Sequence, residues 1–213
     1  MQTQPQLSAD GHQVAVVDYA NFQTLVFALR GVDVVISTVV GPNQLLLIQA
    51  AVAASVRKYV AAEFEGLPHL RPPNDPLDRY RTAARQLLVS YAQRMQHTSF
   101  ICGILYERFQ PGGLRQSYIG RTSEFDNEGS FIMDCRNMRA EAPIYDASGR
   151  PRVTLCLTAA QDVARFVTRA LSMSSWPTEL RMCGQRITVA DLIALTEQLK
   201  RMSSELQSTS LPS

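Results

Sequence analysis

The chain has 213 residues, of which 46% are hydrophobic and 19% are charged, and its formal net charge is +2. This composition is typical of a soluble globular protein that buries a core of its own, and it excludes fibrous and extensively disordered classes. The small net charge provides no strong field for nucleic acid or for an anionic membrane, so neither is predicted as a direct partner.

Apolar segments and cysteines narrow the class further. The longest apolar run, Leu45 to Val56, is too short to cross a bilayer, and no basic start with an apolar region marks a signal peptide, which predicts a cytoplasmic protein. The cysteines show neither CxxC nor Cys/His ligand spacing, so we expect reduced core thiols, no metal site and no redox pair. They stand at Cys102, Cys135, Cys156 and Cys183.

The first forty residues predict two strands and a helix. Val14 to Val17 is a continuous apolar run, typical of a strand buried on both faces, and Asp18 follows at its carboxyl end. Asn21 is a suitable N-cap for a helix through Leu29. The β-branched run VDVVISTVV then predicts another interior strand.

The same alternation continues to about residue 103. Gly41 and Pro42 turn the chain into a helix, with the proline suited to the first helical turn. A helix, a strand, a longer helix and a strand are predicted over 43–55, 58–61, 76–95 and 98–103. Strands that alternate with crossover helices indicate a parallel sheet, so we predict a doubly wound α/β fold.

After Gly103 the periodicity changes, and residues 117–147 are irregular. The elements predicted beyond this point are strands at 131–133, 152–157 and 180–183, and two helices that begin after the capping patterns Thr158/Gln161 and Thr188/Asp191. The Ser-rich end of the chain has little to bury and is predicted to be disordered. We therefore assign residues 13–200 to one domain and 201–213 to a tail.

Several polar residues could carry chemistry, and each has a structural alternative. Asp18 could accept hydrogen bonds from a nucleotide at a strand end, or it could cap a turn. Glu63 and Glu65 are expected in a loop, where adjacent carboxylates are usually solvated. No GxGxxG or GxxGxxG phosphate-binding motif occurs in the chain.

Arginines and aromatic residues leave similar alternatives open. Arg79, Arg81 and Arg85 share or adjoin one face of the predicted long helix, where they form either a solvated face or a contact with a phosphate or a substrate oxygen. Aromatic residues that could line a pocket or simply pack are Tyr106, Phe109 and Trp176.

Taken together, several segments resemble one family. The stretches GVDVVIS, KYVAAEFEG, GILYERFQPGG and LTAAQDVARFVTRAL are similar to the NmrA-like and isoflavone-reductase-like branch of the atypical short-chain dehydrogenases, most closely to fungal NmrA-like proteins. The resemblance covers about residues 14–199. It implies a Rossmann-like fold with a small irregular substrate-side region, NADP or NAD as the cofactor and a small-molecule substrate.

The resemblance also assigns roles to individual residues. Those expected to contact the cofactor are Asp18, Ser37, Thr38, Val39, Ala61 and Ala62. Those expected to contact the substrate are Glu63, Phe64, Tyr106 and Phe109. Arg81 occupies the position of the family's catalytic lysine, and Ala62 occupies that of a serine. Because arginine does not shuttle a proton as lysine does, hydride transfer would differ from the family pattern.

The resemblance begins at the third strand of the family's Rossmann half. We therefore expect a chain that lacks the first βαβα segment and is truncated at both ends. Three interpretations stay open: a reductase of a small secondary metabolite, a catalytically inactive nucleotide-sensing or regulatory protein, and a non-functional fragment with an exposed sheet edge. A protein partner or a homo-oligomer is compatible with the last two.

Overall fold

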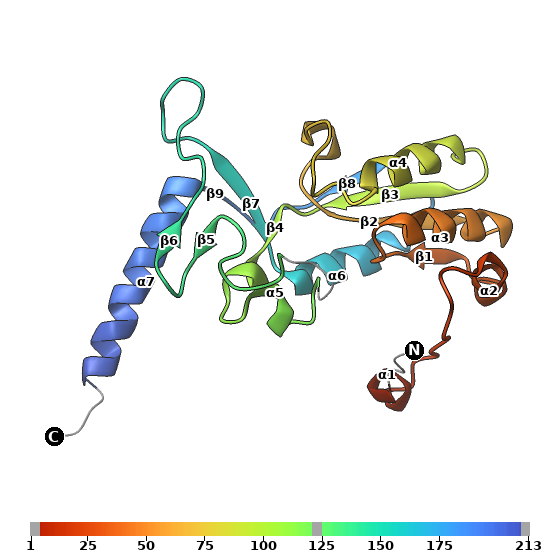
Figure 1. The fold of residues 1–213 in the computed structure, drawn as a ribbon, viewed down its shortest axis with the longest axis horizontal. Coiled ribbons are helices and arrows are strands. Elements are labelled where there is room, and N and C mark those ends of the chain that lie inside the picture. The colour runs from red at the N-terminus through yellow and green to blue at the C-terminus, as the bar shows by residue number, and fades with distance from the viewer. Residues whose placement is uncertain (1–4, 121–124, 210–213) are drawn as a thin grey trace. The chain divides into compact units, whose positions relative to one another are not determined.

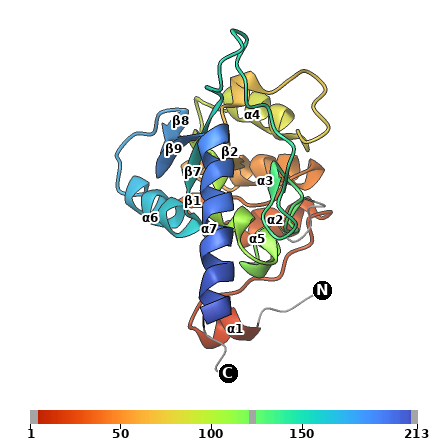
Figure 2. The same cartoon turned by 90° about the vertical axis from the view of Figure 1, so that its left-hand side faces the viewer.

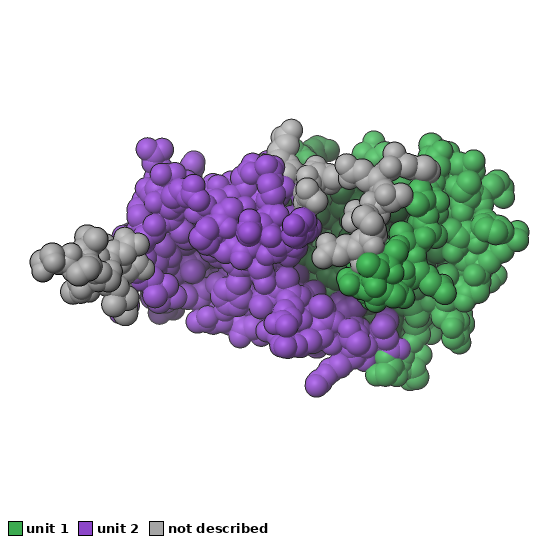
Figure 3. Space-filling view, turned by 90° about the horizontal axis from the view of Figure 1, so that it is seen from below, with its two compact units in different colours: residues 1–101, 172–180 green, residues 102–171, 181–213 purple. Residues whose placement is uncertain are grey.

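The computed structural model describes residues 5–120 and 125–209. The chain forms two compact units, residues 1–101 with 172–180 (unit 1) and residues 102–171 with 181–213 (unit 2), which are coloured separately in Figure 3. Unit 1 contains α1 (Pro5–Ala9), α2 (Phe22–Ala28), β1 (Val34–Ile36), α3 (Pro42–Ala53), β2 (Lys58–Glu65), the 3-10 helix η1 (Pro68–Leu70), α4 (Arg81–Ser90), β3 (Gln96–Ile101) and most of β8 (Glu179–Arg181).

Unit 1 is built on a sheet with the strand order β1-β2-β3-β8. β1 pairs with β2 and β2 pairs with β3, both in parallel, and Val35 lies opposite Tyr59. The register between β2 and β3 shifts after Val60 and resumes with Phe64 opposite Phe100. These parallel strands with crossover helices confirm the predicted α/β class.

Helices α2, α3 and α4 contribute to one core with β2 (Figure 1). Its fully buried side chains include Leu25, Ile48, Tyr59 and Leu88, one from each of these four elements. The predicted helix start at Asn21 is confirmed, because its side chain accepts hydrogen bonds from the backbone N–H groups of residues 23 and 24.

The strand predicted at Val14 to Val17 is wrong. These residues form neither helix nor strand, and Val14 and Val16 are exposed. A continuous apolar run becomes an interior strand only when strands pair with it on both sides, and among the described residues no strand lies beyond β1 in this sheet. For the same reason β1 is an edge strand in the described sheet, and not the predicted interior one.

Two boundaries in unit 1 also differ from the sequence prediction. β2 continues to Glu65, so residues 62–65 are strand where a loop was expected. The long helix begins only at Arg81, because Arg79 and Tyr80 have positive φ angles of 45° and 65°, which a right-handed helix does not accommodate.

Unit 2 contains β4 (Ile104–Leu105), the 3-10 helix η2 (Tyr106–Phe109), α5 (Gly113–Gln116), β5 (Met133–Asp134), β6 (Arg139–Ala140), β7 (Thr154–Thr158), α6 (Ala160–Ala170), β9 (Gln185–Thr188) and α7 (Val189–Thr209). One sheet has the order β4-β7-β9, in which β7 is parallel to β4 and antiparallel to β9. β5 and β6 form a separate antiparallel pair. The core of this unit is built around Met133, Leu157 and Leu192.

The helix ends of unit 2 test the predicted caps. Thr188 and Asp191 bond to each other at the start of α7, as predicted, and α7 runs as one helix to Thr209 (Figure 2). This helix replaces the disorder predicted for residues 201–209, and residues 210–213 lie outside the described part. The cap predicted at Thr158 is wrong: the carboxylate of Glu107 accepts from the N–H of Ala160 instead.

The cysteine prediction is wrong for one pair. A disulfide joins Cys156 of β7 to Cys183 in the turn before β9. The two residues are 27 positions apart in sequence, so local spacing gives no sign that the antiparallel pairing brings them together. Within residues 5–120 and 125–209, no helix is long and apolar enough to span a membrane, and no group of three potential metal ligands occurs.

Candidate functional site

The carboxyl end of β1 is tied closely to β2. The N–H of Ser37 donates to the carbonyl of Val60 at 3.0 Å, and the hydroxyl of Ser37 accepts from the N–H of Val39 at 3.2 Å. Ser37 is buried and Val39 is half-buried, whereas Thr38 between them is exposed. This ordered strand end leads directly into α3, whose first residue is Pro42. A parallel-sheet strand end followed by a helix N-terminus is where Rossmann-type folds place ligands.

Asp18 is exposed and belongs to a local turn. Its carboxylate accepts from the N–H of Ala20 at 2.9 Å, and its carbonyl accepts from the N–H of Asn21 at 3.0 Å. This geometry matches the turn alternative recognised in the sequence. The predicted contact with a nucleotide stays a prediction.

The residues predicted along the cofactor and the substrate in β2 are mostly buried. Ala61 and Ala62 are 2% and 4% exposed. Phe64 is half-buried and its ring stacks parallel to that of Phe100, with centroids 5.9 Å apart. Glu63 is 1% exposed, so the solvated loop carboxylate expected from the sequence is in fact a buried charge.

Glu63 belongs to an arginine–carboxylate network at the carboxyl end of β2. The network consists of Glu63, Glu65, Arg71, Asp78, Arg79 and Arg81. Arg71 lies at its centre and contacts Glu63 at 2.7 Å and Asp78 at 3.1 Å. Burial opposes the charge of Arg71, but the hydrogen bond and the charge of Glu63 outweigh it and raise the pKa of Arg71. The three arginines and the three carboxylates balance in formal charge.

The side chain of Arg81 is buried in unit 1, where it makes hydrogen bonds and an ion pair. Its guanidinium donates to the carbonyls of Ala62 at 3.3 Å and Leu77 at 3.0 Å and pairs with Glu65 at 2.5 Å. Its side chain is 6% exposed, and this burial lowers the pKa of Arg81. The side chain therefore connects the end of β2 to the start of α4. The predicted catalytic role of Arg81 is untested, and its present contacts are structural.

Arg71 and Asp78 are not among the site residues predicted from the sequence. Asp78 accepts from the N–H of Thr82 at 3.1 Å and from its hydroxyl at 2.6 Å, and so supports the first turn of α4. Burial raises the pKa of Asp78, but the Thr82 hydrogen bonds and the charge of Arg71 act in the opposite direction and the net pKa is lowered. A buried carboxylate such as Glu63 needs a cationic partner. A search for such a partner near Glu63 in the sequence could have pointed to Arg71.

Asp78 predicts an acid-dependent loss of stability. Because its pKa is lower in the folded protein than in the unfolded chain, its contribution is complete above the unfolded pKa and is lost as the pH falls through the folded pKa. Asp78→Asn should flatten the acid limb of a plot of unfolding free energy against pH, measured by urea denaturation. Asp162→Asn, which alters an exposed carboxylate paired with Arg165, is the control that makes the same change of charge. An unchanged limb in Asp78→Asn would contradict the assignment.

A surface hollow of about 500 Å³ adjoins the network in unit 1. Its lining is Asp75, Pro76, Asp78, Arg79, Tyr80, Thr82, Ala83 and Gln86. Among these, the Nε of Arg79 is buried without a hydrogen-bond acceptor in the described structure. The ring of Tyr80 beside this donor is exposed.

Tyr106 and Phe109 lie in η2 of unit 2. Both pack against the core formed by Met133, Leu157 and Leu192. The hydroxyl of Tyr106 donates to the side-chain oxygen of Gln185 at 2.9 Å. Their predicted contact with a substrate is untested, and within unit 2 they have the packing role that was the alternative interpretation.

The parallel sheet and its crossover helices define a Rossmann-like α/β protein. No protein-family model and no curated protein matches the sequence. The fold does match solved structures. AtPrR2 with NADP+ and (+)-pinoresinol has 19% sequence identity and a TM-score of 0.65, over 92% of this chain and 62% of that one.

Two other structures show the same fold. The leucoanthocyanidin reductase–NADPH complex from Vitis vinifera is 16% identical, with a TM-score of 0.61 over 88% of this chain and 60% of that one. A nucleoside-diphosphate-sugar epimerase from Staphylococcus aureus is 18% identical, with a TM-score of 0.58 over 85% of this chain and 58% of that one. This chain spans about three-fifths of the length of these structures.

Proposed function

We propose that this chain is an NAD(P)-binding protein of the isoflavone-reductase-like and NmrA-like type, which reduces a small secondary metabolite. The observation that carries the proposal is the fold match over 92% of the chain with a structure that holds NADP+ and (+)-pinoresinol. The leucoanthocyanidin reductase complex with NADPH supports the same cofactor class. A related match, DesIV with NAD, keeps NAD as the alternative nucleotide.

The nucleotide would lie at the carboxyl ends of β1 and β2. Ser37 to Val39 and the Ala61–Ala62 pair would face it, as the family resemblance implies. The N-terminus of α3 adds a partial positive charge next to this strand end, which favours a phosphate or another anion. Tyr106 and Phe109 are proposed to contact the substrate.

A second candidate is a nucleotide-binding regulatory protein without catalysis. Arg81 is buried against two carbonyls and Glu65, and Ala62 has no hydroxyl, so neither position supplies a group for proton transfer. Under this proposal the protein would report the redox state of the nucleotide to a protein partner. Both candidates require the same nucleotide site.

Titration of the purified chain with NADPH and with NADP+ tests the shared site. We expect saturable binding at micromolar concentrations with a rise in Tm, because a ligand that binds the folded state stabilises it. Thr38→Glu should weaken binding about tenfold or more, since it adds a negative charge at the exposed strand end beside the phosphates. Gln49→Glu adds the same charge at an exposed position within α3 and should change affinity little.

The outcomes separate the candidates. No binding of either nucleotide at millimolar concentration would contradict both. Binding combined with oxidation of NADPH in the presence of aromatic carbonyl compounds would support the reductase. Binding without any oxidation across such a panel would favour the regulatory protein.

A further inference from the structure

The Cys156–Cys183 disulfide lies in unit 2 where a turn folds back on a strand. The Cα atoms are 5.6 Å apart, which is within the usual range for a disulfide. The turn packs closely on β7, because a Cβ added at Gly184 would lie 2.9 Å from the carbonyl oxygen of Leu157. The two cysteines are therefore held together by the fold as well as by the bond.

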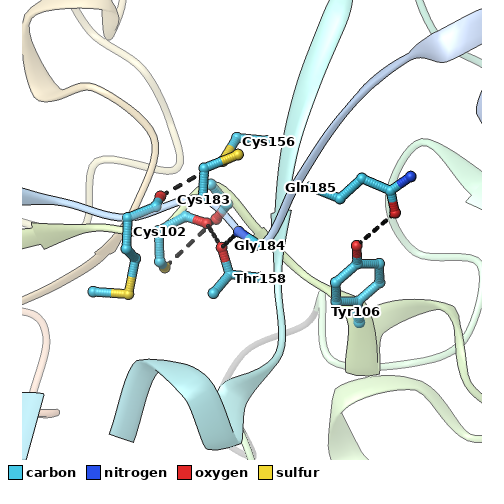
Figure 4. The surroundings of a disulfide bond; sticks show 9 residues. Cys102, Tyr106, Cys156, Thr158, Cys183, Gly184 and Gln185 are labelled. Carbon is cyan, nitrogen blue, oxygen red and sulfur yellow. Dashed lines mark hydrogen bonds between the residues drawn. A yellow bond between two sulfur atoms is a disulfide. The ribbon is translucent and has the colours of Figure 1, made fainter. Parts of the chain in front are cut away.

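The two cysteine residues differ in their exposure to solvent. Cys183 is exposed, whereas Cys156 is half-buried and its Sγ lies 3.5 Å from the carbonyl oxygen of Met182 (Figure 4). Thiol–disulfide exchange requires a thiolate to reach a sulfur atom, so an external reagent meets Cys183 first. The less exposed Cys156 is then placed to attack the sulfur of Cys183 as the second thiol.

We propose that Cys156 and Cys183 form a reversible thiol–disulfide site that reacts with low-molecular-weight disulfides of the glutathione class. In the reduced protein the Cys183 thiolate attacks one sulfur of glutathione disulfide, whose S–S bond breaks and releases one glutathione. The Cys156 thiolate then attacks the Cys183 sulfur and releases the second glutathione. Two electrons pass from the protein to glutathione disulfide, and the two thiol protons go to the released glutathione.

The contacts around the bond indicate what the site controls. The N–H of Gly184 donates to the hydroxyl of Thr158 at 3.3 Å, and that hydroxyl donates to the carbonyl of Cys102 at 2.7 Å. One residue further, Gln185 accepts from Tyr106 (Figure 4). Reduction leaves the turn held by hydrogen bonds and by its packing on β7, without the covalent link, so the start of β9 and its contact with Tyr106 loosen. The consequence for substrate binding rests on the proposed function, in which Tyr106 contacts the substrate.

Thiol counting tests the site without any nucleotide. The full chain is equilibrated in glutathione buffers of different redox ratio, alkylated with iodoacetamide and mapped by mass spectrometry. We expect Cys156 and Cys183 to be blocked together in oxidising buffer and alkylated together in reducing buffer. Cys156→Ser should retain a glutathione adduct on Cys183, since the resolving thiol is lost, and Cys135→Ser in the same unit should behave as the unsubstituted chain.

Hydrogen exchange of residues 182–188 measures the structural consequence. Reduction should accelerate exchange there about tenfold, because opening of the turn becomes easier. Tyr106→Phe, which removes the bond to Gln185 and leaves both sulfur atoms, should accelerate exchange in the oxidised protein. The proposal would be overturned by any of three results. Both cysteines could be fully alkylated in every buffer, or the disulfide could resist reduction at every glutathione ratio. The exchange rate of residues 182–188 could also be the same in the oxidised and the reduced protein. Failure of NADPH binding would instead affect the proposed function alone.

Discussion

Glu63→Gln is expected to lower the free energy of unfolding by about 3 kcal/mol, because it removes one charge of a buried ion pair and leaves the other buried. The side chains of Glu63 and Arg71 are 2% and 10% exposed, and their closest atoms are 2.7 Å apart. Asp78 still contacts Arg71 in the variant, which keeps the cost at the low end of the range for broken buried pairs. Urea denaturation of the two proteins measures the difference.

Two further variants separate this effect from a general loss of charge. Asp33→Asn breaks the ion pair with Arg57, whose side chains are 67% and 75% exposed, and should cost less than about 1 kcal/mol. The double variant Glu63→Gln/Arg71→Met should recover part of the loss, because it removes the orphaned charge as well. Equal losses of unfolding free energy in Glu63→Gln and Asp33→Asn would show that the buried ion pair contributes no more to stability than the exposed one.

The elements that the sequence predicts well are those specified by local chemistry. Asn21 caps α2 and Pro42 opens α3, because a side-chain acceptor and a fixed φ act within one helical turn. The strands β2 and β3 are predicted by apolar runs between helical patterns. Their parallel pairing follows from the alternation of strands and helices. The Rossmann-like class can therefore be predicted from the sequence alone.

The features that the sequence does not reveal depend on distant partners. Val14 to Val17 has the composition of a buried strand, yet burial requires neighbouring strands that the described sheet does not provide. Glu63 has the composition of a loop carboxylate, yet Arg71 reaches it from beyond η1. Cys156 and Cys183 meet only through an antiparallel pairing across unit 2.

The candidate site illustrates the same division. The strand ends that hold Ser37 and Ala62 follow from the predicted topology, so their position could be anticipated. The contacts of Arg81 could not be anticipated, because its acceptors come from two separate segments: Ala62 and Glu65 from β2, and Leu77 from the loop before α4. The arginine that stands where the family resemblance predicts a lysine thus has a structural explanation, since its fork of donors reaches all three acceptors and a lysine ammonium lacks that geometry.

Gly103→Ala is expected to destabilise the protein by about 2–4 kcal/mol, through backbone strain and overpacking together. Gly103 has a φ of +71°, where a residue with a side chain is disfavoured. A Cβ there would lie 2.1 Å from the carbonyl oxygen of Cys156 and 2.9 Å from its Cβ. Because the first of these atoms is backbone, β7 itself would have to move. The shift in the urea midpoint measures the cost.

Gly31→Ala separates the backbone strain of a positive φ from the steric clash of the added Cβ. Gly31 has a similar φ of +77°, but a Cβ there would meet no atom within 4 Å, so only the conformational cost of about 1 kcal/mol is expected. Equal losses in the two variants would contradict the predicted clash with Cys156. If β7 does move, Cys156 moves with it, and Gly103→Ala should also lower the fraction of Cys156–Cys183 disulfide formed in oxidising glutathione buffer. Gly31→Ala should leave that fraction unchanged, because its neighbourhood belongs to unit 1.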